Sequence, residues 1–447
     1  MPDPAVDLPV DPADRREGAR TPLRVLVLGG GGREHALALA LARDPQVVEV
    51  HAAPGNPGTA EVATNHAVDP LDGAAVSALA VRLGVDLVVV GPEAPLVLGV
   101  ADAVRAHGIA CFGPTAAAAQ LEGSKAFAKD VMEAAGVPTA ASRLCRDADE
   151  VAAALDAFGP PYVVKDDGLA AGKGVVVTED RDAALAHAAG CERVVVEAYL
   201  DGPEVSLFAV TDGTSVRAMQ PAQDFKRVGD GDAGPNTGGM GAYTPLPWAP
   251  AGLVEDVIRR VLEPTVAEMA RRGVPFSGLL YAGLALTSRG MQVVEFNARF
   301  GDPETQPLLA RLETPLGGLL LAAATGRLAD EPELAWSGSA AVGVVLAAEG
   351  YPGTPTTGGV VSGLEVASTD GAVVVQAGTA FAPDGSVVSS GGRVLTVVGT
   401  GPDLAQARAT AYAGIERLDL PGSFYRHDIA EQAALRAAHP ATQETAR

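Results

Sequence analysis

The chain has 447 residues, of which 47% are apolar and 20% charged, and its formal net charge is −22. This length suits about three domains, and so apolar a composition supplies large buried cores and argues against global disorder. The acidic charge argues against a nucleic-acid partner and an anionic membrane surface, and its simplest alternative meaning is solubility.

The cysteines and histidines indicate neither a disulfide frame nor a zinc cluster. Cys111, Cys145 and Cys191 lie far apart without CxxC spacing, as in a reduced cytoplasmic protein. The seven histidines show no paired-ligand spacing, and no apolar run reaches the ~18 residues of a membrane span. Residues 1–22 lack the apolar region of a signal peptide, so we expect them to form a disordered tail, and residues 441–447 are assigned as a C-terminal tail.

Strand and helix patterns alternate from Leu23, which predicts an N-terminal doubly wound parallel sheet over residues 23–123. Its first strand runs into the loop GGGGREHA, Gly29–Ala36, and then into a helix, an arrangement that favours a bound anion. A sharp turn without a ligand is the alternative. Glu34 occupies the last position of the G-x-G-x-x-G pattern, so a phosphate-bearing small molecule is favoured over NAD.

A second unit is predicted over residues 124–344, with a compact lid over about residues 143–212. Ser124 is a good N-cap for the helix that opens this unit. Within the lid, VVKDDGLAAGKGVVV joins two strands, so it is a hairpin loop and not the strand-to-helix loop of Walker A. Such a loop can fold over nucleotide phosphates, and Lys165 is placed to reach them; a surface lysine is the alternative.

Two further segments of this unit are unusually rich in polar side chains. DFKRVGDGDAGPNTGGMGAY, Asp224–Tyr243, clusters Lys226 and Arg227 beside glycines in an acidic chain. It is interpreted as an anion site, with an ordered structural loop as the alternative. Farther on, VVEFNARFGDPETQ places Glu295 and Asn297 two residues apart on a predicted strand, so both side chains face the same side.

A third unit of mixed α/β character is predicted over residues 345–440. The segments VGVVLAAEG, VVVQAGTAF and VLTVVG indicate strands, and DLAQARATAYAGIERL indicates a helix. Arg393 and Arg426 of this unit are interpreted as partners of acidic side chains, and contact with a ligand is the alternative.

Seven segments in order carry a family resemblance: GGREHA, APGNPGTA, VGPEAPLVLGV, FGPTAAAAQLEGSK, DGLAAGKGV, KRVGDGDAGPNTGGMGAY and EFNARFGDPETQ. Together they resemble the phosphoribosylamine–glycine ligase (glycinamide ribonucleotide synthetase) family of the ATP-grasp superfamily, over about residues 23–429. The resemblance implies an N-terminal doubly wound domain, a central ATP-grasp fold with a small mobile lid, and a C-terminal mixed α/β domain.

The resemblance implies a reaction of de novo purine biosynthesis. The carboxylate of glycine would attack the γ-phosphorus of ATP to give glycyl phosphate and ADP. The amine of 5-phosphoribosylamine would then displace phosphate to give glycinamide ribonucleotide. Such transfer asks mainly for positioning and charge neutralisation. The implied partners are therefore small molecules, with Mg²⁺ or Mn²⁺ as the metal, in a cytoplasmic enzyme that we expect to be a monomer.

The resemblance also implies roles for individual residues. Glu295 and Asn297 would be the metal ligands, because their oxygens suit a hard cation. Arg299, Lys226 and Asp302 would be the catalytic residues. The residues implied for ATP are Lys125, Lys165, Gly172, Lys173, Gly174, Glu197, Ala198, Tyr199, Leu200 and Glu204. Those implied for phosphoribosylamine and glycine are Gly29, Gly30, Gly31, Gly32, Arg33, Glu34, Asn56, Gly91, Pro92, Glu93, Asp224, Gly238, Gly239, Met240 and Gly241.

The chain departs from the family pattern at Gly30, Asp166 and Phe225 and in two further places that bear on the nucleotide and metal sites. It is short between Thr178 and Arg193, in the lid, and its strand Gly278–Leu286 lacks a carboxylate that other ATP-grasp enzymes use as a metal ligand. The nearest alternatives are an ATP-grasp carboxylase acting on a ribonucleotide and a nucleotide sensor without chemistry. The stretch RFGDPETQ argues against the first, and the retention of Glu295 and Arg299 argues against the second.

Overall fold

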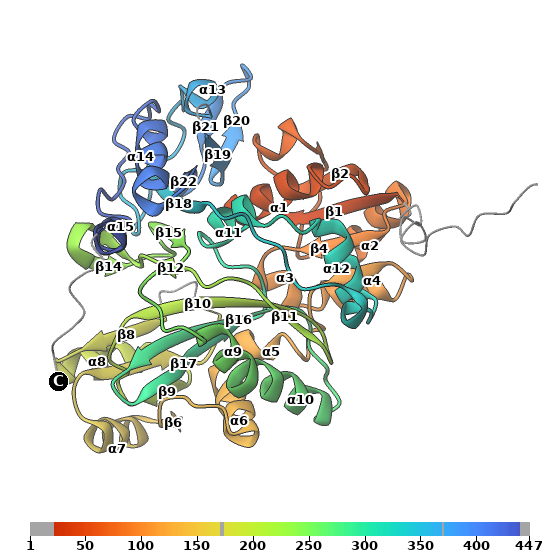
Figure 1. Cartoon of the computed structure of the whole chain (residues 1–447). Helices are drawn as coiled ribbons and strands as arrows, with labels where there is room; N and C mark the ends of the chain where they lie inside the picture. The colour runs from red at the N-terminus through yellow and green to blue at the C-terminus, as the bar shows by residue number, and fades with distance from the viewer. Residues whose placement is uncertain (1–21, 170–173, 369–370, 439–447) are drawn as a thin grey trace, which may run out of the picture.

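The computed structural model of the chain describes residues 22–169, 174–368 and 371–438 (Figure 1). The predicted tails at 1–22 and 441–447 lie outside the described residues, apart from Pro22. The sheets follow the predicted order, with a doubly wound N-terminal domain, a central region that carries a lid, and a C-terminal α/β domain. Among the helices of the described segments, none has both the length and the apolarity that crossing a bilayer requires.

The N-terminal domain is built on a five-stranded parallel sheet with the order β3-β2-β1-β4-β5. Its strands are β1 (Leu23–Gly29), β2 (Val47–Pro54), β3 (Thr64–Asn65), β4 (Leu87–Val90) and β5 (Ala110–Phe112). Its helices are α1 (Gly32–Ala42), α2 (Gly73–Leu83), α3 (Glu93–Val97) and α4 (Val100–Arg105). β1 and β4 are buried almost throughout, because helices cover both faces of the sheet.

The lid is a four-stranded antiparallel sheet with the order β6-β9-β7-β8. Its elements are β6 (Ser142–Cys145), α7 (Ala148–Phe158), β7 (Tyr162–Asp166), β8 (Val175–Thr178), α8 (Arg181–Ala189) and β9 (Val194–Glu197). It has a hydrophobic cluster of its own, in which Leu155 and Val164 are fully buried. The lid was predicted to run to residue 212, but its sheet ends at Glu197, because the next strand pairs along its length with a different sheet.

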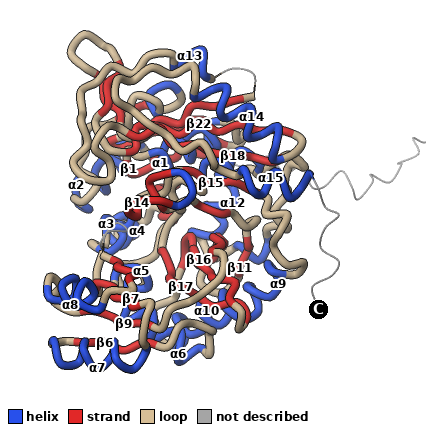
Figure 2. The backbone as a smooth tube through the Cα atoms, turned by 90° about the vertical axis from the view of Figure 1, so that its left-hand side faces the viewer, coloured by secondary structure: helices blue, strands red, loops and turns tan. Residues whose placement is uncertain are grey.

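That next sheet has the order β11-β10-β16-β17 and forms the floor of the cleft described below; its strands are red in Figure 2. They are β10 (Glu204–Asp212), β11 (Val216–Ala218), β16 (Ser277–Thr287) and β17 (Gly290–Asn297). The helices of this region are α5 (Gln120–Gly123), α6 (Lys125–Ala135), α9 (Leu253–Val257), the π-helix η4 (Ile258–Leu262) and α10 (Glu263–Arg271). The predicted cap of α6 is present, since Ser124 Oγ accepts the Phe127 N–H at 3.1 Å.

The C-terminal domain has a five-stranded sheet with the order β12-β15-β18-β22-β19. Its strands are β12 (Gln223–Asp224), β15 (Gly241–Thr244), β18 (Ala340–Ala347), β19 (Ala372–Gln376) and β22 (Arg393–Gly401). Two hairpins accompany it, β13 (Arg227–Gly229) with β14 (Ala233–Asn236) and β20 (Thr379–Phe381) with β21 (Val387–Ser389). The helices are α11 (Thr305–Arg311), α13 (Leu364–Ala367), α14 (Leu404–Ile415) and α15 (Glu431–Ala438), whereas α12 (Leu316–Ala324) packs against β5, β10 and β16.

This sheet begins earlier in the chain than the predicted boundary at residue 345. β12 and β15, from the segment assigned to the ATP-grasp unit, join it because β15 pairs antiparallel with β18 over Gly241–Thr244. The glycine-rich loop at 224–244 is therefore anchored at both ends in the C-terminal sheet. As a result, the C-terminal domain holds one wall of the cleft described below.

The N-terminal and C-terminal domains are joined through the first glycine loop and β19. Asn56 Nδ2 donates to Gly30 O at 3.0 Å and to Gln376 O at 2.9 Å. His35 is 1% exposed, and its Nδ1 accepts the Gln376 N–H at 2.8 Å. Burial lowers the pKa of His35 from 6.5 to about 4, so the imidazole is neutral at this interface.

His35 is expected to make the protein acid-labile. Between pH 6.5 and about 4 the unfolded chain binds a proton at His35 that the folded chain does not, so the free energy of unfolding falls as pH falls. The full contribution is about 3 kcal/mol. His35→Gln, which cannot titrate, should flatten the pH dependence of urea unfolding between pH 7 and 4.5. The exposed His107 supplies the control, and an H107Q variant with the same flattening would refute the assignment.

Candidate active site

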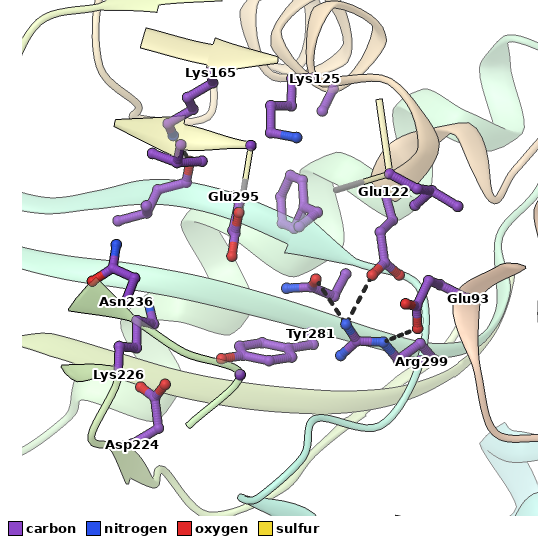
Figure 3. A pocket seen from close by; sticks show the side chains of 18 of the residues that line it. Glu93, Glu122, Lys125, Lys165, Asp224, Lys226, Asn236, Tyr281, Glu295 and Arg299 are labelled. Carbon is purple, nitrogen blue, oxygen red and sulfur yellow. Dashed lines mark hydrogen bonds and ion pairs between the residues drawn. The ribbon is translucent and has the colours of Figure 1, made fainter. Parts of the chain in front are cut away.

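A cleft of about 380 Å³ lies where the lid, the sheet of β10, β16 and β17, and the C-terminal domain meet (Figure 3). The apolar residues of its lining include Leu121, Met132 and Phe296, which belong to one hydrophobic cluster, and also Val175. The charged residues of its lining are Arg33, Glu93, Glu122, Lys125, Lys129, Lys165, Glu197, Glu204, Asp224, Lys226, Glu295, Arg299, Asp302, Glu304 and Arg393. So many charges beside an apolar wall suit a ligand with a flat apolar group and several anionic groups.

Two predicted lysines enter the cleft from the lid side. Lys165, on β7, is 4% exposed, and its Nζ lies 2.9 Å from Glu197 Oε2 and donates to Val294 O at 3.0 Å. Lys125, the first residue of α6, donates to Gly168 O at 3.0 Å. The surface-lysine alternative for Lys165 is therefore wrong, because the side chain is buried and points at the strand that carries Glu295.

Glu295 lies among cations on the floor of the cleft, as Figure 3 shows. Burial alone would raise its pKa, but Lys226, Lys165, Lys125 and Arg299 together lower it below its usual range. The carboxylate is thus ionised at neutral pH. Asn297 follows two residues later on β17, as the alternation predicts.

Arg299 is held between two carboxylates. Its Nε lies 3.2 Å from Glu93 Oε2, and its Nη2 lies 3.0 Å from Glu122 Oε1 (Figure 3). Burial would lower its pKa, but Glu122 and Glu93 hold it above the usual range, so the guanidinium stays charged. Glu122 also accepts the Ala298 N–H at 2.7 Å, which fixes the turn that leaves β17. Glu122 was given no role in the site by sequence reasoning, although it falls within one of the family segments.

Asp224 and Lys226 lie on the C-terminal side of the cleft. Lys226 Nζ forms an ion pair with Glu204, the residue that the family resemblance implies for ATP. Burial raises the pKa of Asp224 to about 7, with Lys226 opposing the shift and Glu304 and Glu204 adding to it. Burial would lower the pKa of Lys226, but the carboxylates of Asp224, Glu204 and Glu295 raise it, so this lysine is charged.

Arg393 connects the glycine-rich loop to the turn after β17. Its Nη1 donates to Gly238 O at 2.7 Å and to Asp302 O at 2.6 Å, and its Nη2 lies 3.6 Å from Asp302 Oδ2. Tyr351 OH accepts the Gly238 N–H at 2.9 Å from the same domain. Burial would raise the pKa of Asp302, but Arg393 and Arg33 lower it, so Asp302 is a carboxylate. Arg393 thus pairs with an acid, as expected, and lines the cleft as well.

Arg426, the other arginine expected to pair with acids, lies outside the lining of the cleft. It is 1% exposed and bonds Asp428 at 2.6 Å and Asp232 at 2.9 Å. Its guanidinium also lies 4.9 Å from the centre of the Phe225 ring. The acid-pairing interpretation of Arg426 is therefore confirmed, and its contacts tie the β13–β14 hairpin to the C-terminal domain.

A buried hydrogen-bonded group to which sequence reasoning gave no role lies at the floor of the cleft, where Tyr281 and Glu304 are part of the lining. Glu304 is 3% exposed and accepts from Tyr281 OH at 2.6 Å and from Ser206 Oγ at 2.9 Å. These residues come from β16, β10 and the turn before α11, so only the folded sheet brings them together. The sequence signal that could have indicated this group was a polar residue, Ser206 or Tyr281, at a buried position of each of two strands.

The first glycine loop supports the cleft from behind, and of its residues only Arg33 is part of the lining. Glu34 is 1% exposed and folds back under the loop, where Oε2 accepts the Gly31 N–H at 2.7 Å and Oε1 lies 2.6 Å from Arg33 Nε. A Cβ on Gly91 would lie 2.0 Å from Glu34 Oε1, so this glycine is required by close packing. Arg33 in turn donates to Phe300 O at 3.1 Å.

The remaining residues implied by the resemblance divide between the cleft and its support. Glu93, Asp224 and Gly238 line the cleft, as do Gly174, Glu197, Glu204, Asn297 and Asp302. Those outside its lining are Gly29, Gly30, Gly31, Gly32, Glu34, Asn56, Gly91, Pro92, Ala198, Tyr199, Leu200, Gly239, Met240 and Gly241. Gly172 and Lys173 lie outside the described residues.

Glu295 and Asn297 fit a hard divalent cation. They offer one ionised carboxylate and one amide oxygen from the same face of β17, the donors that Mg²⁺ and Mn²⁺ prefer. The facing residue on β16 is Gly283, so that strand brings no second carboxylate. In residues 22–169, 174–368 and 371–438, no group of three His, Cys, Asp or Glu side chains forms a closed metal cage. The donor set therefore suits a metal that takes its other ligands from water and substrate.

Comparisons with known proteins give a consistent result. Profiles of the phosphoribosylglycinamide synthetase N domain, ATP-grasp (A) domain and C domain match residues 23–122, 123–305 and 341–432. A Streptomyces coelicolor protein named phosphoribosylamine–glycine ligase is 67% identical over 415 residues, 92% of this chain and 100% of that protein. Its namesake in Mycobacterium bovis is 60% identical over 421 residues, covering 92% and 99%. The crystal structure of phosphoribosylamine–glycine ligase from Thermotoga maritima matches with a TM-score of 0.80 and 33% identity, covering 91% of this chain and 100% of that one.

Proposed function

The chain belongs to the phosphoribosylamine–glycine ligase family, and from this premise we propose how its cleft performs the family's reaction. The enzyme is an ATP-grasp ligase that joins glycine to 5-phosphoribosylamine in purine biosynthesis, using ATP and a divalent metal. The observation that carries the residue assignments is the convergence of Glu295, Lys165, Lys226 and Arg299 on one cleft.

The adenine is assigned to the apolar wall at Leu121, Met132 and Phe296, with the triphosphate running toward Glu295. Lys125, on α6, and Lys165, on the lid strand β7, face that path and neutralise phosphate charge. Glu295 and Asn297 would hold Mg²⁺ or Mn²⁺, which when bound withdraws charge from the phosphate oxygens. Glu204 is paired with Lys226 in this structure. Glu204 could therefore accept hydrogen bonds from the ribose hydroxyls only if this ion pair opened.

The acyl transfer is assigned to the end of the cleft between Arg299, Lys226 and Arg393. A carboxylate oxygen of glycine attacks the γ-phosphorus and the bond to ADP breaks, giving glycyl phosphate. The amine of phosphoribosylamine then attacks the acyl carbon, loses a proton, and phosphate leaves. Arg299 and Lys226 stabilise the charge on the transferred group, and Arg33 and Arg393 face the anionic substrates. Closure of the lid would keep water from the acyl phosphate.

The decisive experiment measures ADP release with Mg²⁺ and ATP, adding glycine and freshly made phosphoribosylamine singly and together. Release that requires both, with glycinamide ribonucleotide identified by mass spectrometry, is the expected result. Release on addition of bicarbonate in place of glycine would indicate a carboxylase. ATP binding without turnover under any combination would indicate a nucleotide sensor.

Arg393→Met is expected to lower kcat/KM for glycine by about 10- to 100-fold, because it removes charged hydrogen bonds that join the Gly238 loop to the Asp302 turn. The KM for ATP should change little. Arg408→Met is the matched control, since Arg408 pairs with Glu431 in the same domain and lies outside the lining of the cleft. Equal kinetics for the two variants would remove Arg393 from the substrate site.

The cytoplasmic location and the monomeric state are also proposed. The chain has no CxxC-spaced cysteines, and its three free thiols, Cys111, Cys145 and Cys191, suit a reducing compartment. Light scattering during size-exclusion chromatography tests the monomer, whose mass would be 45.1 kDa.

A further inference from the structure

The lysines of this chain are confined to its cleft, as far as the described residues show. The sequence contains 28 arginines but only five lysines. Of these, Lys125, Lys129, Lys165 and Lys226 lie in the described segments, and all four line the cleft. Surface cations are thus supplied by arginine, and a lysine is used where a compact point charge is needed. The family resemblance implies roles for Lys125, Lys165 and Lys226, but none for Lys129.

The hydrogen-bond donors of the lysines separate Lys129 from its neighbours. An ammonium group has three N–H donors. Lys129 Nζ meets three protein acceptors, Thr139 Oγ1 at 2.8 Å, Ala140 O at 3.1 Å and Glu197 Oε1 at 3.0 Å. All its donors are therefore used within the protein, and none is left for a ligand.

Lys165, by contrast, has a donor to spare among the described residues. Its Nζ meets only Glu197 Oε2 at 2.9 Å and Val294 O at 3.0 Å. Glu197 is 3% exposed and divides its two oxygens between Lys129 and Lys165. The carboxylate is thus balanced by two cations, only one of which can turn toward a ligand.

We propose that Lys129 is a positioning residue for ATP: by occupying one oxygen of Glu197, it keeps Lys165 free to direct an N–H at the triphosphate. This inference rests on the proposed placement of the triphosphate beside Lys165. Without the Lys129 charge, Glu197 would be a buried carboxylate with Lys165 as its single cation, and it would hold the Lys165 ammonium more tightly. The same position filled by arginine would bring a planar fork that does not match three acceptors around one nitrogen.

Lys129→Met is expected to weaken ATP binding about tenfold, the value of one charged hydrogen bond, and to raise the KM for ATP by a similar factor. Adenosine has no phosphate, so its binding, measured by displacement of a fluorescent ATP analogue, should stay the same. A residue that served only to hold the fold would weaken both ligands alike. The double variant K129M/E197Q should recover most of the lost ATP affinity, because a neutral amide in place of the Glu197 carboxylate no longer withdraws Lys165.

Arg181→Met is the matched control, because Arg181 pairs with Asp156 at 2.8 Å within the lid but lies outside the lining of the cleft. The inference is overturned if K129M binds ATP as R181M does, if ATP and adenosine weaken equally, or if K129M/E197Q is as weak as K129M. If K129M fails to fold, ATP and adenosine binding are compared in K129Q instead, because this variant removes the charge and retains a donor for Thr139. Binding does not require turnover, so a wild-type protein that binds ATP but makes no ribonucleotide would refute the ligase assignment separately.

Discussion

Glu295→Gln is expected to lower kcat by at least about a hundredfold while leaving the fold intact. The carboxylate is kept ionised by Lys226, Lys165, Lys125 and Arg299, so the substitution removes a negative charge at the meeting point of four cations. Groups placed to act on developing charge in a closed site are typically worth factors of about 10² to 10³ in kcat. The amide is isosteric, so the free energy of unfolding should change by only about 1 kcal/mol.

The measurement is ADP release against Mg²⁺ concentration, together with Mn²⁺ binding followed by electron paramagnetic resonance. If Glu295 is a metal ligand, the metal needed for half-maximal activity rises in the variant and Mn²⁺ binds more weakly. Glu333→Gln is the control, since the side chain of Glu333 is 90% exposed and its Oε1 lies 3.8 Å from Arg217 Nε, away from the cleft. Unchanged turnover and unchanged Mn²⁺ binding in E295Q would contradict the metal assignment.

Features that depend on the spacing of residues along one strand, or on the order of strands and helices in the chain, can be predicted from the sequence. Glu295 and Asn297 are two residues apart on a strand, and that spacing alone places them on one face. The parallel N-terminal sheet follows in the same way from buried strands that alternate with helices. In both cases the signal lies within a few consecutive residues, so no knowledge of distant contacts is needed.

Contacts between domains leave no such signal. Arg393 bonds Gly238 and Asp302 in the folded structure, in which β15, β18 and β22 pair side by side. The spacing of apolar residues in the sequence does not predict this strand order. The strand β10 was joined to the lid for a related reason. It follows β9 after a short connection, and only its pairing with β16 shows that it belongs to the next sheet.

The sequence motif of a glycine-rich loop does not show which groups accept its backbone N–H donors. The anion site at Gly29–Gly32 stays a prediction, and in the structure one N–H of this loop, that of Gly31, donates to Glu34. The rotamer of Glu34 decides where this N–H donates, and that rotamer depends on close packing against Gly29 and Gly91. Lys129 lies one turn after Lys125 on α6 and belongs to no motif, so its contacts with Thr139 and Glu197 appear only in the folded structure.

Arg299→Met is expected to lose both turnover and stability, and the two losses should be separable. The substitution leaves Glu93 and Glu122 without their guanidinium partner in a largely buried setting. Breaking such a pair costs about 3–5 kcal/mol of unfolding free energy. kcat should fall about 10²- to 10³-fold, because the lost charge faces the transferred phosphoryl group in the proposed site.

The pH dependence of that destabilisation identifies its cause. Burial already raises the pKa of Glu122, and Arg299 opposes the shift, so the variant should hold a proton on Glu122 to still higher pH. Above the unfolded-state pKa the unfolded chain loses this proton first, so the stability of the variant falls as pH rises. The deficit in Tm against wild type should therefore be smaller at pH 5 than at pH 8.

A second substitution then separates structure from catalysis. Glu122→Gln in the Arg299→Met background removes the more deeply buried of the two orphaned carboxylates, while Glu93 keeps Arg33 nearby, and it retains an acceptor for the Ala298 N–H. This double variant should regain most of the lost Tm at pH 8 and none of the lost turnover. Recovery of both would mean that Arg299 acts only by bracing the turn after β17. Recovery of neither would mean that Glu122 is not the group left unpaired. We expect stability to be restored without activity. Arg299 both pairs with Glu93 and Glu122 and lines the cleft, and the double variant corrects only the lost pairing.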